Sequence, residues 1–382
     1  MKCKLLDICE YRKGKVNTSN LTLKTYISTE NMLPDKAGIL EANSLPSTAL
    51  VQEYKENDIL ISNIRPYFKK IWQAKYDGGC SNDVLVFQGN LNVDKDFLYY
   101  ILANDDFFAY SMATSKGTKM PRGDKKSIMQ YELQLFDIKT QKRIASILKV
   151  LDKKIELNNA INKNLERQAE ALFHSLFVEN VNPIWKDGVL SDLGTVVAGG
   201  TPSKTKPEYY SEKGIAWITP KDLSLNKSKF ISHGKIDISE LGFSKSSAIK
   251  MPTGTVLFSS RAPIGYIAIA ANEVTTNQGF KSIVPNENVG TAFMYYLLKF
   301  LLPTIEGIAS GSTFKEISGA GMKSVPVVIP DNETIDKFNA FCTPIFQQQE
   351  VLEAENSRLV DIRDALLLKL MVGELDVSDI EP

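Results

Sequence analysis

A heptad pattern of apolar residues runs through residues 140–177 and constrains the fold more than any other feature. Apolar positions follow one another at alternating steps of four and three, the spacing of a helix that buries one stripe against another helix. No Pro or Gly occurs from residue 140 to 181, so the pattern predicts an unbroken helix of roughly 60 Å at 1.5 Å per residue. The stripe consists of Ile144, Leu148, Leu151, Ile155, Asn158, Asn162, Leu165, Ala169, Leu172 and Leu176.

The same pattern returns between residues 338 and 370, near the C-terminus. Two helices with matching stripes in one chain are expected to form an intramolecular antiparallel pair, which places Ile144 near Leu370 and Asn158 near Asn356. The alternative is that two unrelated helices are each buried in a separate domain. The second stripe consists of Phe338, Cys342, Ile345, Gln349, Leu352, Asn356, Leu359, Arg363, Leu366 and Leu370.

The segments that precede the two predicted helices also repeat one another, which favours the paired arrangement. In the first segment, runs typical of strands occupy 23–27, 58–64 and 83–87, a helical pattern occupies 93–112, and a Gly-, Pro- and Lys-rich loop occupies 115–127. Residues 26–32 correspond to 217–223, 58–62 to 255–259, and 97–102 to 293–298. The predicted organisation is a first domain at 1–139, a helix and linker at 140–183, a second domain at 184–332, and a helix and tail at 333–382.

Composition excludes several classes of protein. Lys+Arg 45 balances Asp+Glu 45, which argues against a chain covered in nucleic acid but not against local basic faces. Four Cys and two His show no metal-ligand spacing, and Cys342 is interpreted as a small core residue. No charged-then-apolar leader and no apolar run of about 18 residues occurs, so a cytoplasmic protein without membrane contact is expected. Phosphate loops, dinucleotide fingerprints and nucleophile elbows are also missing from the sequence.

Three polar loops in the second domain have a composition suited to nucleic acid. They lie at 199–206, at 259–266 together with 275–279, and at 310–315. Gly lets backbone N–H groups approach phosphate, while Ser, Thr and Lys add donors and Arg, Asn and Gln can pair with base edges. Each loop taken singly is more often a solvated loop, but matching positions in the first domain are also polar or basic. These are Asn63, Arg65, Lys69, Ser81, Asn82, Thr118 and Lys119, beside a basic loop with Lys116, Lys119, Arg122, Lys125 and Lys126.

These motifs resemble the specificity subunit of type I restriction–modification systems. The segments that carry the resemblance are 199–203, 217–222, 259–265, 276–280, 311–315 and 367–375. The resemblance implies an α+β fold in which two mixed α/β target-recognition domains are joined by two long antiparallel helices. It also implies that each domain reads one half of a bipartite DNA site while the helices set the gap, with no catalytic centre and no cofactor in this chain.

The resemblance further implies partners and site residues. Two methyltransferase subunits would bring S-adenosylmethionine, and restriction/translocase subunits would use ATP and Mg. Leu165, Leu172, Leu359 and Leu366 are expected to contact partners. Double-stranded DNA is expected to bind Arg65, Lys69, Asn82, Thr118, Lys119, Arg122, Thr201, Ser203, Lys204, Lys221, Arg261, Asn277, Gln278, Thr313 and Lys315.

Other functions are compatible with the same helices. One is the recognition subunit of a type IIB-like system, and another is a non-catalytic coiled-coil scaffold whose two domains bind proteins. The basic loop at 116–126 and the loop of Arg261 favour DNA over a scaffold. Arg261 has an alternative role as well, since it can pair with an acidic neighbour inside its own domain.

Overall fold

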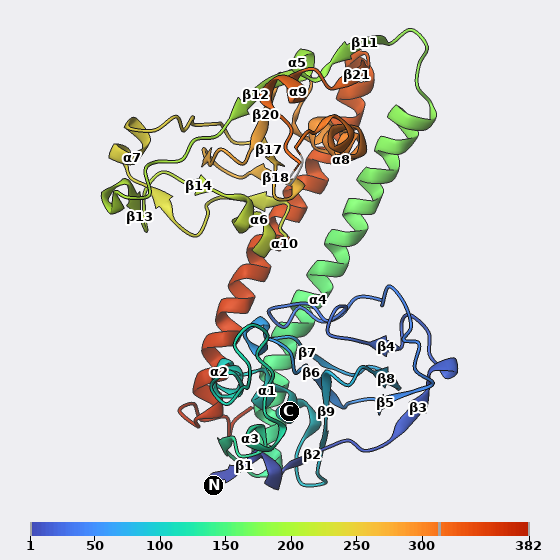
Figure 1. Ribbon diagram of the computed structural model, residues 1–382, viewed down its shortest axis with the longest axis vertical. Coiled ribbons are helices and arrows are strands. Elements are labelled where there is room, and N and C mark those ends of the chain that lie inside the picture. Colours follow the sequence, from blue (N-terminus) through green and yellow to red (C-terminus); the bar gives the residue numbers. More distant parts are fainter. Residues whose placement is uncertain (1, 312–314, 381–382) are drawn as a thin grey trace. The chain divides into compact units, whose positions relative to one another are not determined.

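The computed structural model describes residues 2–311 and 315–380. Contacts divide the chain into two compact units, one formed by Met1–Ile155 with Arg358–Pro382 and the other by Glu156–Ser357. Both units contain part of the two long helices, α4 (Ile138–His174) and α10 (Asn332–Met371). Each unit therefore consists of one mixed α/β domain and a paired segment of the two helices (Figure 1).

The first domain has two four-stranded sheets. One has the order β2-β9-β6-β7 and is antiparallel throughout, and the other has the order β3-β5-β8-β4, in which β4 and β8 are parallel. A two-stranded ribbon joins β1 (Lys2–Lys4) to β10 (Glu132–Gln134). The other strands are β2 (Cys9–Tyr11), β3 (Lys15–Asn17), β4 (Tyr26–Ile27), β5 (Leu50–Tyr54), β6 (Ile59–Ser62), β7 (Ile71–Gln73), β8 (Gly78–Cys80) and β9 (Val84–Gly89).

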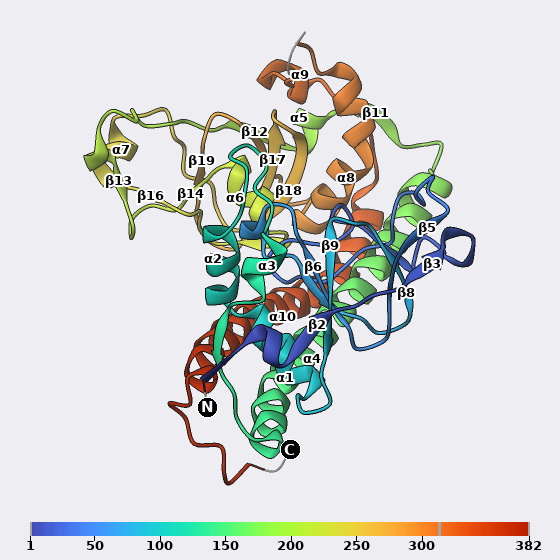
Figure 2. The ribbon, with the colours of Figure 1, turned by 60° about the horizontal axis from the view of Figure 1, so that its bottom comes forward.

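Alternation along β6 and β9 gives the first sheet two buried faces. Ile59, Ile61, Leu85 and Phe87 pack on one side with the helices, while Leu60 packs on the other side with residues of the second sheet. The helices α1 (Lys95–Ala103), α2 (Asp105–Ala113) and α3 (Lys125–Ile128) lie on the same side of β6 and β9 in both ribbon views (Figures 1 and 2). The sheet thus forms the middle layer of the domain.

The sequence prediction of a single helix over 93–112 was wrong. The chain breaks at Asn104, which has extended backbone angles and caps the second helix by accepting a hydrogen bond of 3.1 Å from the Asp106 backbone N–H. The next two residues, Asp105 and Asp106, suit the first turn of a new helix because its N-terminus carries partial positive charge. The strand expected at 23–27 shrinks to Tyr26–Ile27, and the loop expected at 115–127 ends in α3.

The second domain is built around a five-stranded sheet of order β12-β20-β17-β18-β15. Its edge strand β15 (Phe230–Ile231) is parallel to β18, and the other pairs are antiparallel. The remaining strands of this sheet are β12 (Gly194–Ala198), β17 (Val256–Ser260), β18 (Ile264–Ala270) and β20 (Lys281–Pro285). Three ribbons pair β11 (Lys186–Val189) with β21 (Pro326–Ile329), β13 (Tyr210–Ser211) with β16 (Asp237–Ile238), and β14 (Trp217–Ile218) with β19 (Thr275–Thr276).

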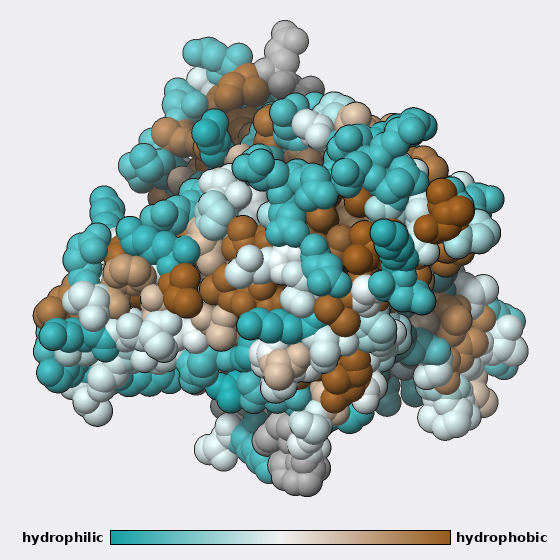
Figure 3. Space-filling view, turned by 90° about the horizontal axis from the view of Figure 1, so that it is seen from above, coloured by the Kyte–Doolittle hydropathy of each residue, from teal (hydrophilic) through white to brown (hydrophobic). Residues whose placement is uncertain are grey.

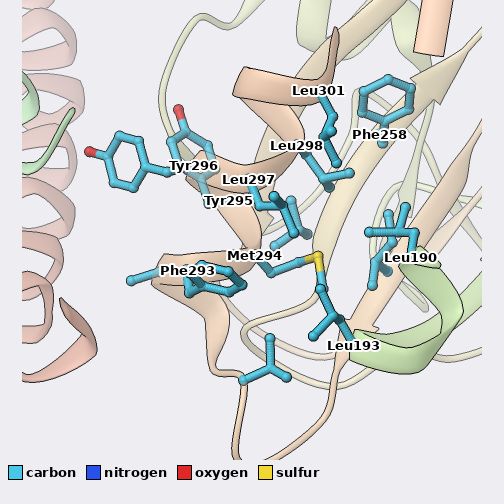
Figure 4. Close-up of a cluster of buried hydrophobic side chains, with 14 of the residues drawn as sticks. Leu190, Leu193, Phe258, Phe293, Met294, Tyr295, Tyr296, Leu297, Leu298 and Leu301 are labelled. Carbon is cyan, nitrogen blue, oxygen red and sulfur yellow. The ribbon is translucent and has the colours of Figure 1, made fainter. Parts of the chain in front are cut away.

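The long helix of this domain, α8 (Thr291–Ile308), supplies most of its core. Phe293, Met294 and Leu298 pack with Phe258 of β17 and with Leu193 of the short helix α5 (Leu190–Leu193) (Figure 4). The hydroxyls of the neighbouring tyrosines 295 and 296 point away from this apolar cluster (Figure 4). The remaining short helices are α6 (Pro220–Leu225), α7 (Glu240–Ser244) and α9 (Gly319–Lys323).

The two long helices pair in each unit as the heptad pattern predicts. In the first unit Ile144 of α4 and Leu370 of α10 are buried in one apolar cluster. In the second unit the Asn158 side-chain amide donates a hydrogen bond of 2.9 Å to Oδ1 of Asn356. The predicted antiparallel pairing and its register are therefore confirmed. The buried Cys342 packs in the core of the second unit, also as predicted.

The ends of the long helices differ in detail from the prediction. α4 ends at His174 and is followed by one π-helical turn, Ser175–Glu179, rather than by further α-helix. α10 continues through Pro344, whose side chain faces solvent. Among the residues described, no helix is long and apolar enough to span a bilayer. On the face shown in Figure 3, hydrophobic residues form small patches separated by hydrophilic side chains.

Candidate nucleic-acid interface

Three loops of the first domain meet where β6 ends. The Asn63 N–H donates to the Asp83 carbonyl at 2.8 Å, and the Asn63 carbonyl accepts from the Gly123 N–H at 3.1 Å. The Arg65 N–H donates to the Pro121 carbonyl at 2.8 Å. The structure therefore gathers the segments 63–65, 81–83 and 116–123, which hold most of the residues predicted to bind DNA in this domain. We call this group of segments the first loop cluster.

Arg65 has an unusual conformation within the first loop cluster. Its φ of 51° lies in the left-handed region, which costs a non-glycine residue about 1 kcal/mol. Its Nε is buried and has no hydrogen-bond partner in the described part of the chain. Such a donor favours an acceptor brought by a ligand, because an unsatisfied buried donor is costly.

The cations around Arg65 differ in availability. Arg122 is exposed and pairs with Asp83 at 3.3 Å, so its charge lies at the surface of the cluster. Asn82, Thr118 and Lys119 are exposed as well. Lys69 instead donates a hydrogen bond of 2.7 Å to Asp105 at the start of α2. Its ammonium is therefore held by its own domain and is the weakest candidate of the set.

Two aromatic residues beside this cluster were missed in the sequence. Tyr67 and Phe68 follow Arg65-Pro66 and are 49% and 37% exposed, with ring centroids 4.7 Å apart. Exposed aromatic rings next to an Arg offer stacking surfaces for bases. The signal available in the sequence was two adjacent aromatic residues in a segment otherwise rich in polar and basic residues.

The second domain builds a comparable cluster at the end of β17. The Ser260 N–H donates to the Gly279 carbonyl at 2.8 Å, and the Ser260 carbonyl accepts from the Ile317 N–H at 3.1 Å. Arg261 therefore lies between the segments 276–279 and 310–317. We call these three segments, together with the adjoining segment 199–206, the second loop cluster.

The Gly-rich segment lies directly on the 276–279 turn. The Gly200 N–H donates to the Thr276 carbonyl at 2.8 Å, and the Thr201 hydroxyl contacts the side chain of Gln278. Any Cβ at Gly199 would lie 2.0 Å from the Asn277 carbonyl oxygen, so only glycine fits there. Ser203 and Lys204, further along the segment, are exposed, as is Lys221 on α6.

Arg261 has an internal partner. Its guanidinium lies 3.3 Å from the carboxylate of Glu316, and the Arg261 side chain remains 39% exposed. The Lys281 ammonium is 3.8 Å from the same carboxylate, and its burial lowers its pKa although Glu316 acts to raise it. The alternative weighed from the sequence, pairing with an acidic neighbour, is thus present in this structure. Lys315 is exposed and approaches the Glu306 carbonyl at 3.5 Å, and Thr313 lies outside the described residues.

The two loop clusters share one framework. In the first domain Arg122 forms isolated strand bridges with Ile64 and with Lys116, and in the second domain Glu316 does so with Arg261 and with Ser310. Arg65 and Ala262 follow the bridged strand residue in both cases, with φ of 51° in each, and each precedes a proline. The same backbone arrangement therefore carries Arg122 in one domain and Glu316 in the other. One scaffold presents two different surfaces.

The leucines expected to contact partners serve the internal packing. Leu165 and Leu172 are half-buried against the core of the second unit, and Leu366 is half-buried against that of the first. Leu359 is half-buried too. Other apolar side chains of the long helices are more exposed, namely Val150, Leu157, Ile161, Val351, Ile362 and Leu368.

Comparison with known proteins places this framework in a family. Residues 1–167 and 184–354 match the model of the type I restriction modification DNA specificity domain. The HindI specificity subunit of Haemophilus influenzae is 26% identical over 92% of this chain and 94% of its own length. The MjaIX specificity subunit of Methanocaldococcus jannaschii is 39% identical over 170 residues, which are 44% of this chain and 39% of that protein.

A solved structure shows the same fold. The crystal structure of the type I restriction–modification S subunit from M. genitalium matches 97% of this chain and 96% of its own, with a TM-score of 0.60 at 18% identity. Two copies of the family domain cover most of the sequence, and the fold of two α/β domains and two long helices agrees with that structure. The chain therefore belongs to the type I restriction–modification DNA specificity family, whose members are specificity components rather than catalytic subunits.

Proposed function

We propose that each loop cluster reads one half of a bipartite, asymmetric DNA site. The observation that carries this proposal is the shared framework of the two clusters with exchanged side chains, Arg122 against Glu316. A common scaffold fits two similar tasks on similar duplexes, while different side chains at matched positions favour different base sequences. Base-edge contacts would come from Arg261 and from Asn277 and Gln278, and phosphate contacts from Lys204, Lys221 and Lys315.

We also propose that the paired helices α4 and α10 dock two methyltransferase subunits and set the gap between the two half-sites. Leu165, Leu172, Leu359 and Leu366 would act from within, by fixing the shape of the helix pair. The more exposed apolar side chains, such as Leu157 and Ile161, would meet the partner directly. Restriction/translocase subunits would then join through the methyltransferases.

Co-expression with a methyltransferase encoded beside this gene, followed by mapping of methylated adenines, tests this function. The expected result is methylation within one bipartite sequence. Replacing residues 184–332 with the corresponding domain of another family member should change one half of that sequence and leave the other half. If both halves change together, or if the sequence has a single continuous core, the two domains do not read separate half-sites.

A chain that only scaffolds proteins would behave differently in a binding assay. Phosphate contacts make affinity fall steeply with salt, by a slope of about 0.9 per neutralised phosphate. The full chain is therefore expected to bind a duplex of its mapped sequence with a marked salt slope, and to bind an unrelated duplex much more weakly. Equal binding to both duplexes at every salt concentration contradicts sequence recognition.

A further inference from the structure

The outward face of α4 carries a row of exposed cations. At the 100° per residue of an α-helix, the row stays within about 60° of one line and lies opposite the apolar stripe that faces α10. Glu156 is the acidic residue on that face. The row consists of Lys139, Lys142, Lys149, Lys153, Lys163 and Arg167, all of which are exposed.

The corresponding face of α10 has the opposite charge. With Phe338 as the counterpart of Ile144, Lys139 corresponds to Glu333 and Arg167 to Asp361. The other four cations of the row also correspond to exposed residues that are acidic or uncharged, namely Asp336, Thr343, Gln347 and Ser357. In each unit taken alone, the α4 segment has the basic face and the α10 segment the acidic one.

A row of lysines on a long helix is usually a solvated face, balanced by nearby acids. Here Lys142, Lys153, Lys163 and Arg167 have no salt-bridge partner among the described residues, whereas Lys149 pairs with Asp96. A helix that needed charge only for solubility would have no reason to differ in sign from its repeat. The sequence difference between the two helices thus calls for a ligand that distinguishes them.

We propose that the basic row of α4 contacts the phosphates of the unread DNA between the two half-sites. This inference rests on the proposed function, because α4 connects the two recognition domains and a duplex held by both must pass along it. The row extends over roughly 42 Å at 1.5 Å per residue, a length comparable to about 12 base pairs of B-DNA. The acidic face of α10 repels the same phosphates and so fixes which side of the helix pair meets the duplex.

Such contacts are independent of sequence, since they reach phosphate and not base edges. They add affinity for a duplex that carries both half-sites and hold its central segment straight against the helix. They also give the gap a physical role, because the gap length sets which phosphates face the lysines.

The test uses the full chain and a duplex of its mapped bipartite site, with affinity measured by fluorescence anisotropy at several salt concentrations. The row variant carries K142Q, K153Q, K163Q and R167Q. The matched control carries K2Q, K13Q, K15Q and K186Q, which remove the same charge from exposed lysines outside the row and the loop clusters. Thermal unfolding of both variants checks the fold, and the half-variants K142Q/K153Q and K163Q/R167Q replace the row variant if it does not fold.

The row variant is expected to lose at least tenfold in affinity at about 0.1 M salt and to have a salt slope smaller by about two to four. The control is expected to change less than threefold. Neutral methylphosphonate linkages placed only in the gap should weaken binding of the unmodified chain severalfold and leave binding of the row variant unchanged. That non-additive result locates the contact in the gap.

Equal losses in the row variant and the control overturn the inference, because net charge alone then explains the effect. Unchanged DNA affinity with weakened binding of the methyltransferase subunit also overturns it, since a protein partner then covers the row. Failure of the proposed function looks different: the unmodified chain itself would not prefer its mapped duplex to an unrelated one.

Discussion

Asn158 on α4 donates a hydrogen bond of 2.9 Å to the side-chain oxygen of Asn356 on α10, in the middle of both heptad stripes. The same Asn158 amide also donates to Glu355 at 2.7 Å, and the Asn158 residue is 1% exposed. A buried amide pair within an apolar stripe lowers stability compared with apolar residues, but it fixes the register of the two helices. The pair therefore defines where each helix stands relative to the other in that unit.

Replacing this amide is the first prediction. Asn158→Leu is expected to raise the free energy of unfolding, or to leave it within about 1 kcal/mol, while it weakens the register of the helix pair. Urea unfolding measures the first effect, and a disulfide engineered across the two helices in the native register reports the second through slower, incomplete crosslinking. Asn159→Leu, at an exposed neighbouring position, is the control. Complete native-register crosslinking in Asn158→Leu would contradict a role in register.

The second prediction concerns Lys229, a buried cation where β15 meets the helices. Its ammonium contacts Glu166 of α4 and accepts further stabilisation from Oε1 of Gln349 at 2.7 Å and from the ring of Phe346 at 4.3 Å. Removing one partner of a buried pair leaves the other charge unpaired, which costs about 3 kcal/mol. Lys229→Met should therefore lower the free energy of unfolding by about that amount in urea titrations.

Two comparison variants make this measurement decisive. The double variant Lys229→Met, Glu166→Leu should recover part of the loss, because no unpaired charge remains. Lys337→Met, which breaks the exposed pair with Glu333, should change stability by less than about 0.5 kcal/mol. If Lys229→Met costs no more than Lys337→Met, the Lys229 contacts do not hold the second domain on the helices.

The third prediction is a pH dependence carried by Glu166. Burial alone would raise the pKa of this carboxyl, but the ammoniums of Lys229 and Lys299 bring it down to about 2. Because the folded value lies below the unfolded value of about 4.5, the charged carboxylate stabilises the fold fully above that pH. This contribution is lost progressively as the pH falls toward 2.

The measurement compares the native chain with Glu166→Gln between pH 7 and pH 3. The stability difference between them should be constant near neutral pH and should shrink below about pH 4.5. Glu353 acts in the opposite direction, since its burial raises its pKa, but it is present in both proteins and cancels in the difference. A difference that grows on acidification contradicts the assignment.

How much of this could be read from the sequence depends on the range of the interaction. The helix pair and its Asn158–Asn356 contact followed from periodicity, which is a local property repeated over many turns. The break at Asn104 did not, because the apolar positions on both sides keep a helical spacing and only the cap shows the change of direction. Lys229 gave no signal at all, since its partners Glu166 and Gln349 are distant in the chain. Likewise, the pairing of Arg261 with Glu316 depends on how two loops meet.

The fourth prediction concerns Arg261, whose guanidinium is half-exposed beside Glu316. If Arg261 reads a base edge, Arg261→Ala should cost roughly 1–3 kcal/mol in binding and relax specificity at one position. Lys315→Ala, which would remove a phosphate contact, should weaken binding to all sequences and reduce the salt slope by about one. Competition binding against single-base variants of the mapped site distinguishes the two patterns. Unchanged affinity in both variants, with the fold intact, removes both residues from the interface.

The last prediction is that the helix pair acts as a ruler for the gap. Inserting one heptad into the middle of both α4 and α10 preserves both apolar stripes and lengthens each helix by about 10 Å. At about 3.4 Å per base pair, the unread gap should grow by up to about three base pairs. Because the groove that faces each loop cluster rotates with spacing, some shorter insertions should abolish binding instead of shifting the gap. Insertion of four residues breaks the stripe and should impair the helix pairing itself. Methylation mapping in a partner-complemented strain reads the gap directly, and full methylation of the parental sequence by the heptad variant would assign the spacing to the partner subunits or the loops.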